Sequence, residues 1–238
     1  MENKYSLSLV IPAFNEEELL AGIIRESAVE LSKVSDDFEI ILVNDGSTDR
    51  TGQIAQKLAE EFKFLKIVNL EKNRGVGEAT IAGLLAAQKE IIFNNTVDAF
   101  FNIKELPRFL PYFASYDIVS GYRTNLKSNS IYGKILTIGN FRLIKFLFPR
   151  PKLRAYQTVQ FIKNEVIKKI KIEAETTFIA PEILIKADHF GYKIKELGTE
   201  YQKRKAGEGK CGKPKFVIRS FYDILRCWFK WKILDKWE

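Results

Sequence analysis

The sequence predicts an α/β fold in which a mostly parallel central sheet carries helices on both faces and an amphipathic helix follows at the C-terminus. Short β-branched apolar runs alternate with amphipathic stretches through the first half of the chain. The links between them are short, and this alternation favours parallel strands joined by right-handed crossovers. A chain of 238 residues that is 46% hydrophobic is long enough to bury the core of such a domain.

Each expected element has its own signal. The run 6–12 is short, β-branched and ends at a proline, as a buried strand does, and 16–33 repeats apolar residues at helical spacing. Prolines end an expected helix over 131–148, and a glycine closes one over 182–190. The other expected strands are 38–43, 65–70, 90–93, 116–120, 160–162 and 192–197, and the other expected helices are 51–62, 77–88, 165–171 and 216–237.

Charge is unevenly distributed along the chain. The formal net charge is +8, and from Tyr201 onward eleven basic residues stand against four acidic ones, a surplus of seven. The first 200 residues are therefore nearly neutral, and the tail is expected to meet an anion, which leaves nucleic acid, a phosphorylated substrate and anionic lipid open. We divide the chain into an α/β domain over 1–215 and a C-terminal helix over 216–238.

Cysteine content and hydropathy indicate the cellular compartment of the protein. Cys211 and Cys227 are the only cysteines, which fits a reducing compartment. The sequence opens without the pattern of a signal peptide, and no uncharged apolar run approaches the roughly 18 residues that a membrane-spanning helix needs. These patterns predict a cytoplasmic protein.

Polar clusters follow the first two expected strands, with the sequences PAFNEE and NDGSTD. Asn15 and Ser47 are residue types that cap helices, so we expect capping to account for part of each cluster. Helix capping does not explain why Asp45 and Gly46 stand at the start of the turn that follows the second expected strand. A carboxylate at the end of a strand can accept a hydrogen bond from a base N–H or a ribose hydroxyl, and a glycine lets the chain turn tightly beside it.

A third cluster, NRGVGEA over 73–79, precedes an expected helix. Its G-x-G is not the dinucleotide-binding fingerprint, because no third glycine follows and the turn after the first strand lacks glycine. Arg74, just before the helix, can hold a phosphate or a base, or it can be an ordinary surface arginine.

Together these segments resemble the family 2 glycosyltransferases. VIPAFNEE (10–17), VNDGSTD (43–49) and NRGVGEA (73–79) match the family's motifs in order and spacing. Four later segments are similar to the polyprenyl-phosphate branch, which includes dolichyl-phosphate mannosyltransferase: GYR (121–123), APEILIKA (180–187), GYKIKE (191–196) and RKAGEGK (204–210). The resemblance covers residues 5–230 and implies the GT-A fold, the fold of nucleotide-diphosphosugar transferases.

The resemblance also implies where the nucleoside of a nucleotide-diphosphate sugar donor would bind. Pro12, Phe14, Glu16 and Asp45 would surround its base and ribose. Phe14 stands where tyrosine is usual, so a hydroxyl contact is lost and the stacking face is kept. Asn44 stands where a first aspartate is common, a change that the family tolerates.

Basic residues are expected to hold the phosphates. The loop over 204–215 combines glycines, which let backbone N–H groups approach a phosphate, with lysines and an arginine that supply charge. A solvated basic loop is the alternative. The resemblance assigns Arg204 and Lys210 to the phosphates of the donor and of a polyprenyl phosphate acceptor, and Arg123, just after a strand, is a further candidate.

The metal motif departs from the family's pattern. The family places Asp-x-Asp after the fourth strand, where the carboxylates hold Mg²⁺ or Mn²⁺ against the donor diphosphate. Here the register gives Thr96-Val97-Asp98, and Phe100 stands where glutamine is frequent. Asp98 alone can hold an ion together with both phosphates. Alternatively, arginines and lysines neutralise the diphosphate without a metal, or catalysis is lost.

The last expected helix combines a polar stripe with a wide apolar sector. Arg219, Asp223, Arg226 and Lys230 share one face, and aromatic and aliphatic residues surround them. Aromatic residues with basic flanks suit a membrane interface, and the helix over 131–148 is similar. Core packing, a dimer seam or docking on an integral membrane partner are the alternatives.

The sequence therefore predicts an inverting glycosyltransferase that moves a sugar from a nucleotide-diphosphate donor to a polyprenyl phosphate at the cytoplasmic face of the membrane. Asp98, Arg123, Arg204 and Lys210 would position and neutralise the leaving diphosphate. The alternative is a catalytically impaired GT-A protein that binds a membrane or a partner. Nucleic acid is not an expected partner, because the tail's aromatics share a helix with aliphatics instead of lying on a β platform.

Overall fold

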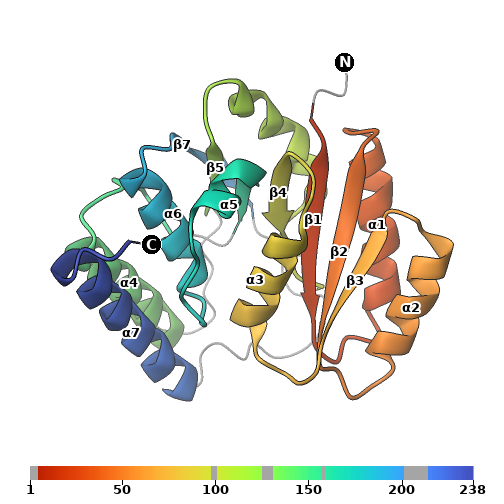
Figure 1. Cartoon of the computed structure of the whole chain (residues 1–238), viewed down its shortest axis with the longest axis horizontal. Helices are drawn as coiled ribbons and strands as arrows, with labels where there is room; N and C mark the ends of the chain where they lie inside the picture. The colour runs from red at the N-terminus through yellow and green to blue at the C-terminus, as the bar shows by residue number, and fades with distance from the viewer. Residues whose placement is uncertain (1–4, 98–100, 125–130, 157–158, 201–213, 238) are drawn as a thin grey trace.

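The centre of the molecule is a seven-stranded sheet with the order β3-β2-β1-β4-β6-β5-β7 (Figure 1). The computed structural model describes residues 5–97, 101–124, 131–156, 159–200 and 214–237. The strands are β1 (Leu7–Ala13), β2 (Phe38–Asp45), β3 (Leu65–Leu70), β4 (Ile91–Asn94), β5 (Ile118–Arg123), β6 (Gln160–Lys163) and β7 (Ile194–Thr199).

The sheet is parallel except for one strand. β1 pairs in parallel with β2 and β4, β2 with β3, and β5 with β7, whereas β6 runs antiparallel to both β4 and β5. Because β6 reverses the direction twice, β5 and β7 point the same way as β1. The expectation of a mostly parallel sheet is confirmed. The carboxyl ends of β1, β2, β4, β5 and β7 therefore share one edge, the edge at which open α/β sheets bind ligands.

Helices cover both faces of the sheet, as expected (Figure 1). Alternate strand residues point to opposite faces, so Val10 and Ile41 belong to one core and Leu9 and Ile40 to the other. The second core contains α1 (Leu20–Ser32), α2 (Thr51–Glu61) and the 3₁₀ turns η1 (Ile103–Arg108) and η2 (Leu110–Ala114). The first contains α3 (Val76–Ala86), α4 (Ile131–Leu147), α5 (Asn164–Lys169), α6 (Ile179–His189), α7 (Pro214–Trp228) and the π-helical turn η4 (Phe229–Ile233).

Some boundaries differ from the sequence expectation. α1 begins at Leu20 instead of residue 16, because the preceding turn has Asn15 at φ +55° and ties its backbone to the neighbouring loop. β2 continues to Asp45 and β5 to Arg123, since pairing with β3 and β7 extends that far. The last helix changes to π-helical geometry at Phe229.

Candidate functional site

The loops after β1 and β2 are joined at the carboxyl edge of the sheet. Thr48 N–H donates to Asn15 Oδ1 at 2.9 Å, and Asn15 N–H donates to Ser47 Oγ at 3.1 Å. The expectation that Asn15 and Ser47 cap helices is wrong: α1 and α2 begin after Leu19 and Arg50, whose side chains make no capping hydrogen bond. The two polar residues instead hold the two loops against each other.

Further contacts order the half-buried residues that follow Asn15. Glu16 N–H donates to Thr51 Oγ1 at 2.8 Å, and Glu17 N–H donates to Asp49 Oδ2 at 3.3 Å. Burial raises the pKa of Asp49, but hydrogen bonds from Thr51 and from the Glu17 backbone outweigh it and hold the pKa below its ordinary value. Glu16, expected near the base and ribose, is thus anchored through its backbone.

Asp45 ends β2 and fixes the loop that precedes α3. Its carboxylate accepts the N–H groups of Arg74 at 2.7 Å and Gly75 at 2.9 Å, and the residue is 3% exposed. Gly46 has φ +63°, and a Cβ there would lie 2.4 Å from the carbonyl carbon of Lys72, so the expected tight turn is confirmed. The second and third polar clusters are therefore held together, and a contact of Asp45 with a base or ribose stays a prediction.

The remaining residues expected around the nucleoside lie along the same edge. Pro12 pairs with Val43 between β1 and β2, and Phe14 is half-buried just beyond β1. Asn44 Nδ2 donates to Asn69 Oδ1 at 3.0 Å. The side chain of Arg74 is 46% exposed, and its Nη1 lies 3.4 Å from Glu78 Oε2.

Asn95, directly after β4, is a site residue that sequence reasoning missed. It is fully buried; its Nδ2 donates to the Phe101 carbonyl at 3.0 Å, and its Oδ1 accepts the N–H groups of Thr96 and Phe101 at 3.0 and 3.3 Å. One amide therefore holds both ends of the segment that contains Asp98 in sequence. Its only signal was a polar residue directly after a buried strand.

The expected phosphate and metal ligands are only partly described. Arg123 ends β5 on the same edge and pairs with Thr199 of β7. Asp98, Arg204 and Lys210 lie outside the described residues. Within the described ranges, no group of three or more His, Cys, Asp or Glu side chains could hold a metal ion.

α7 and η4 turn a shared polar stripe toward the segment 173–175. The stripe residues contact the segment 173–175: Arg219, Asp223, Arg226 and Lys230. Asp223 is 3% exposed and accepts the Glu175 N–H at 3.0 Å. Lys230 pairs with the Glu173 carboxylate. The side chains of Arg219 and Arg226 stay 48% and 39% exposed, so the ion-pairing stripe lies at the border of the buried face of the helix.

Glu173 is the centre of that interface. Its carboxylate also accepts Trp231 Nε1–H at 2.9 Å and lies 3.3 Å from Nζ of Lys186, a fully buried residue of α6. Burial raises the pKa of Glu173, but hydrogen bonds from Lys230 and Trp231 and the charge of Lys186 outweigh it, so the pKa is lowered overall. Burial raises the pKa of Glu182, despite its ion pair with Lys186.

A further face of α7 and η4 is apolar and exposed. Its exposed side chains are Ile218, Phe221, Tyr222, Leu225, Phe229, Ile233 and Leu234. α4 adds Ile138 and Phe146, and the two helices lie next to each other (Figure 1), with the Phe148 ring 5.6 Å from that of Trp231. In the part of the chain that the structure describes, no helix combines the length and apolarity that a membrane span requires.

Residues 8–171 match the family model described as glycosyl transferase family 2. The chain belongs to this family. A similar curated relative is the undecaprenyl-phosphate 4-deoxy-4-formamido-L-arabinose transferase of Pectobacterium atrosepticum, 29% identical over 234 residues that cover 93% of this chain and 67% of the relative. The protein of the same name from Pseudomonas fluorescens SBW25 is 27% identical, with 94% of this chain and 64% of the relative covered.

Solved structures share the fold of this glycosyltransferase. Glucosyl-3-phosphoglycerate synthase from Mycobacterium tuberculosis, in complex with Mn²⁺, UDP-glucose and phosphoglyceric acid, superposes with a TM-score of 0.72 at 17% identity, covering 94% of this chain and 80% of that one. Residues 1–349 of S. aureus TarS, in complex with UDP-GlcNAc, give a TM-score of 0.63 at 20% identity, covering 94% and 65%. The expected GT-A fold is confirmed.

Proposed function

We propose that this family 2 glycosyltransferase moves a sugar from a nucleotide-diphosphate donor to a polyprenyl phosphate at the cytoplasmic face of the membrane. One observation carries the proposal: the loops after β1, β2 and β3 are hydrogen-bonded to one another at the carboxyl edge of one sheet, and the loop after β4 begins at the same edge. The relatives named as undecaprenyl-phosphate sugar transferases, which align over most of the chain, support the choice of acceptor.

The reaction needs no strong general base, because the acceptor phosphate is already ionised. One of its oxygens forms a bond to the anomeric carbon while the bond from that carbon to the donor diphosphate breaks, and the electron pair leaves with the nucleoside diphosphate. Attack from the opposite side inverts the anomeric centre. The protein positions the reactants and neutralises the leaving diphosphate, and Arg123, Arg204 and Lys210 are the cations we assign to this task.

A divalent ion fits the site through one carboxylate. In the sequence Thr96-Val97-Asp98 only Asp98 supplies a charged oxygen, and hard cations such as Mg²⁺ bind through one or two carboxylates plus substrate phosphates. Asp98 would hold Mg²⁺ or Mn²⁺ against the donor diphosphate, where the ion would supply positive charge. Thr96 in place of a second carboxylate favours weak binding of the ion.

The orientation of α7 supports a peripheral position on the membrane. Its charged stripe is paired with the segment 173–175, and a separate apolar face of the helix is exposed to solvent. An interfacial helix buries such a face at the boundary of the headgroups and acyl chains. We assign the exposed faces of α4 and α7 to the lipid surface, with an integral membrane partner as the alternative occupant.

A thermal-shift screen tests the donor site. UDP, GDP, CDP and ADP are each added with and without Mn²⁺. One of them, at about 100 times its Kd, should raise the Tm by about 5 to 10 °C, because binding to the folded state alone stabilises by about 2.7 kcal/mol.

The screen has a matched pair of variants. Asp98→Ala should abolish the Mn²⁺-dependent part of the shift, and Asp36→Ala, which removes an exposed carboxylate, should retain it. If no nucleotide raises the Tm at millimolar concentration, the proposed donor site is wrong. The catalytically impaired protein, which Thr96 favours, would bind a nucleotide and form no product.

A further inference from the structure

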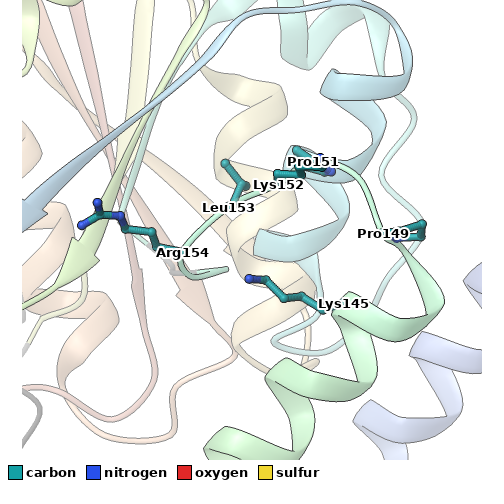
Figure 2. Close-up of a pocket in the computed structure, with 6 residues that line it drawn as sticks. All are labelled: Lys145, Pro149, Pro151, Lys152, Leu153 and Arg154. Carbon is teal, nitrogen blue, oxygen red and sulfur yellow. The ribbon is translucent and has the colours of Figure 1, made fainter.

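A surface cavity of about 450 Å³, wide open to solvent, lies between the C-terminal end of α4 and the segment that follows it (Figure 2). Its lining residues are Lys145, Pro149, Pro151, Lys152, Leu153 and Arg154. Figure 2 shows the Lys145 side chain reaching from α4 toward the segment at Leu153, while the Arg154 side chain extends toward the strands. None of the motifs that led to the glycosyltransferase assignment includes these residues.

The positive charge of this lining is not neutralised within the described part of the chain. No carboxylate there forms an ion pair with Lys145, Lys152 or Arg154. Glu196 of β7 reaches the segment, but its carboxylate accepts the backbone N–H groups of Arg154 at 2.9 Å and Ala155 at 3.2 Å. Three basic residues of the lining therefore stand against this one carboxylate, and the cavity keeps a net positive charge.

The cationic groups are supported by aromatic rings. Arg154 Nη1 donates to the Tyr122 hydroxyl at 3.2 Å, and its guanidinium lies 5.3 Å from the centre of that ring. Lys145 Nζ lies 4.6 Å from the Phe141 ring centre. Such contacts restrict the side chains without removing their charge, so the capacity to bind an anion is kept.

The rest of the lining is apolar and lies beside the exposed face of α4. Two prolines and a buried leucine complete the cavity, and Phe146, next to Lys145 in α4, is 83% exposed. A charged head with a hydrocarbon tail matches such a lining better than a free ion does, because the tail would cover the prolines and the leucine.

We propose that this cavity binds the phosphate group of a membrane lipid. Lys145 and Lys152 contact the phosphate, and the first carbons of the lipid pack on the two prolines. Arg154 contributes a further positive charge without contacting the phosphate. The inference rests on the proposed membrane-facing position of α4 and α7. Polyprenyl phosphate and anionic phospholipids both carry this group, and the test separates them.

The test measures sedimentation of the full chain with vesicles. Three vesicle types are compared: phosphatidylcholine alone, phosphatidylcholine with a polyprenyl phosphate, and phosphatidylcholine with phosphatidylglycerol at equal surface charge. The gain in affinity on adding a phosphate lipid should fall about thirtyfold in the double variant Lys145→Gln/Lys152→Gln, because about 1 kcal/mol is lost for each of the two basic residues near a charged surface.

The control removes the same two charges elsewhere. Lys57→Gln/Lys104→Gln changes exposed lysines on α2 and η1, and it should keep the full gain. A gain that depends on Lys145 and Lys152 with either lipid supports the site, and the lipid with the larger gain is the occupant. Equal losses in both double variants overturn the proposal, because they indicate general charge attraction. So does phosphate-lipid binding that is unchanged without Lys145 and Lys152.

Failure of this inference can be told apart from failure of the proposed function. Sugar transfer by the wild-type protein together with an unchanged gain in the double variant would overturn the cavity alone. A lysine-dependent gain in a protein that transfers no sugar from any donor would support the cavity and contradict the transfer reaction. Competition by inorganic phosphate without any vesicle-dependent gain would overturn the assignment to a lipid.

Discussion

At the scale of single residues, Asp45 has a structural task before any catalytic one. It is 3% exposed and accepts the backbone N–H groups of Arg74 and Gly75. Both donors belong to the loop that leads into α3, so this carboxylate fixes Arg74 at the carboxyl edge of the sheet. Asn95 likewise holds the backbones of Thr96 and Phe101.

Replacing Asp45 should therefore destabilise the fold. Asp45→Ala leaves two backbone N–H groups without an acceptor, and the free energy of unfolding should fall by about 2 to 4 kcal/mol. Asp45→Asn keeps one acceptor oxygen and should lose less. Urea unfolding measures both, with the exposed Asp36→Ala as a control that should stay within about 0.5 kcal/mol of wild type. Wild-type stability in Asp45→Ala would contradict this role.

At this scale the sequence predicts which residue types belong to the site better than it predicts their hydrogen-bond partners. Asp45 and Gly46 stand out because a carboxylate and a glycine at a strand end are informative together. Asn15 and Ser47 are equally typical of helix caps, yet they hydrogen-bond across to each other's loops. The sequence does not single out Asn95, because its hydrogen-bond partner, the backbone of Phe101, is known only from the folded structure.

At the scale of elements, α7 is oriented by charge pairing on its inner face. Lys230 meets Glu173, which lies 57 residues away in sequence. The pattern of polar and apolar residues along the helix predicted a stripe, and it could not predict which side meets the protein, because that depends on this distant acidic segment. The result is a helix that buries Ile224 and Cys227 in the core and leaves a second apolar face exposed to solvent.

The exposed apolar face should carry the attraction to neutral membranes. Ile218→Ser/Ile233→Ser removes side chains that are 69% and 55% exposed, and retention on phosphatidylcholine vesicles should fall about tenfold or more, since each buried aliphatic side chain contributes about 1.5 to 3 kcal/mol. Stability should hardly change, because neither side chain is buried.

A matched control distinguishes membrane binding by this surface from nonspecific hydrophobic adsorption to vesicles. Leu85→Ser/Val29→Ser removes side chains that are 68% and 55% exposed on α3 and α1, away from α4 and α7, and it should leave retention unchanged. If both double variants lose retention equally, or neither does, the apolar face of α7 is not the membrane-binding surface.

At the scale of the whole molecule, the sheet explains why the motifs come together. The strand at 65–70 was predicted with its observed bounds, and parallel strands gather their carboxyl ends at one edge whatever the loops contain. The antiparallel direction of β6 was not predictable from its own residues, because it is set by pairing with β4 and β5. Sequence periodicity therefore supplied the elements, and pairing between distant strands supplied their order.

The most direct test of the central claim is sugar transfer itself. The full chain is incubated with radiolabelled nucleotide-diphosphate sugars, Mg²⁺ or Mn²⁺, and vesicles that contain a polyprenyl phosphate, and the lipid fraction is analysed for label. At least one donor should give a lipid-linked sugar, and Arg204→Ala or Lys210→Ala should reduce its formation severely while thermal unfolding stays unchanged. Absence of labelled lipid with every donor, from folded protein that binds the vesicles, would contradict the claim.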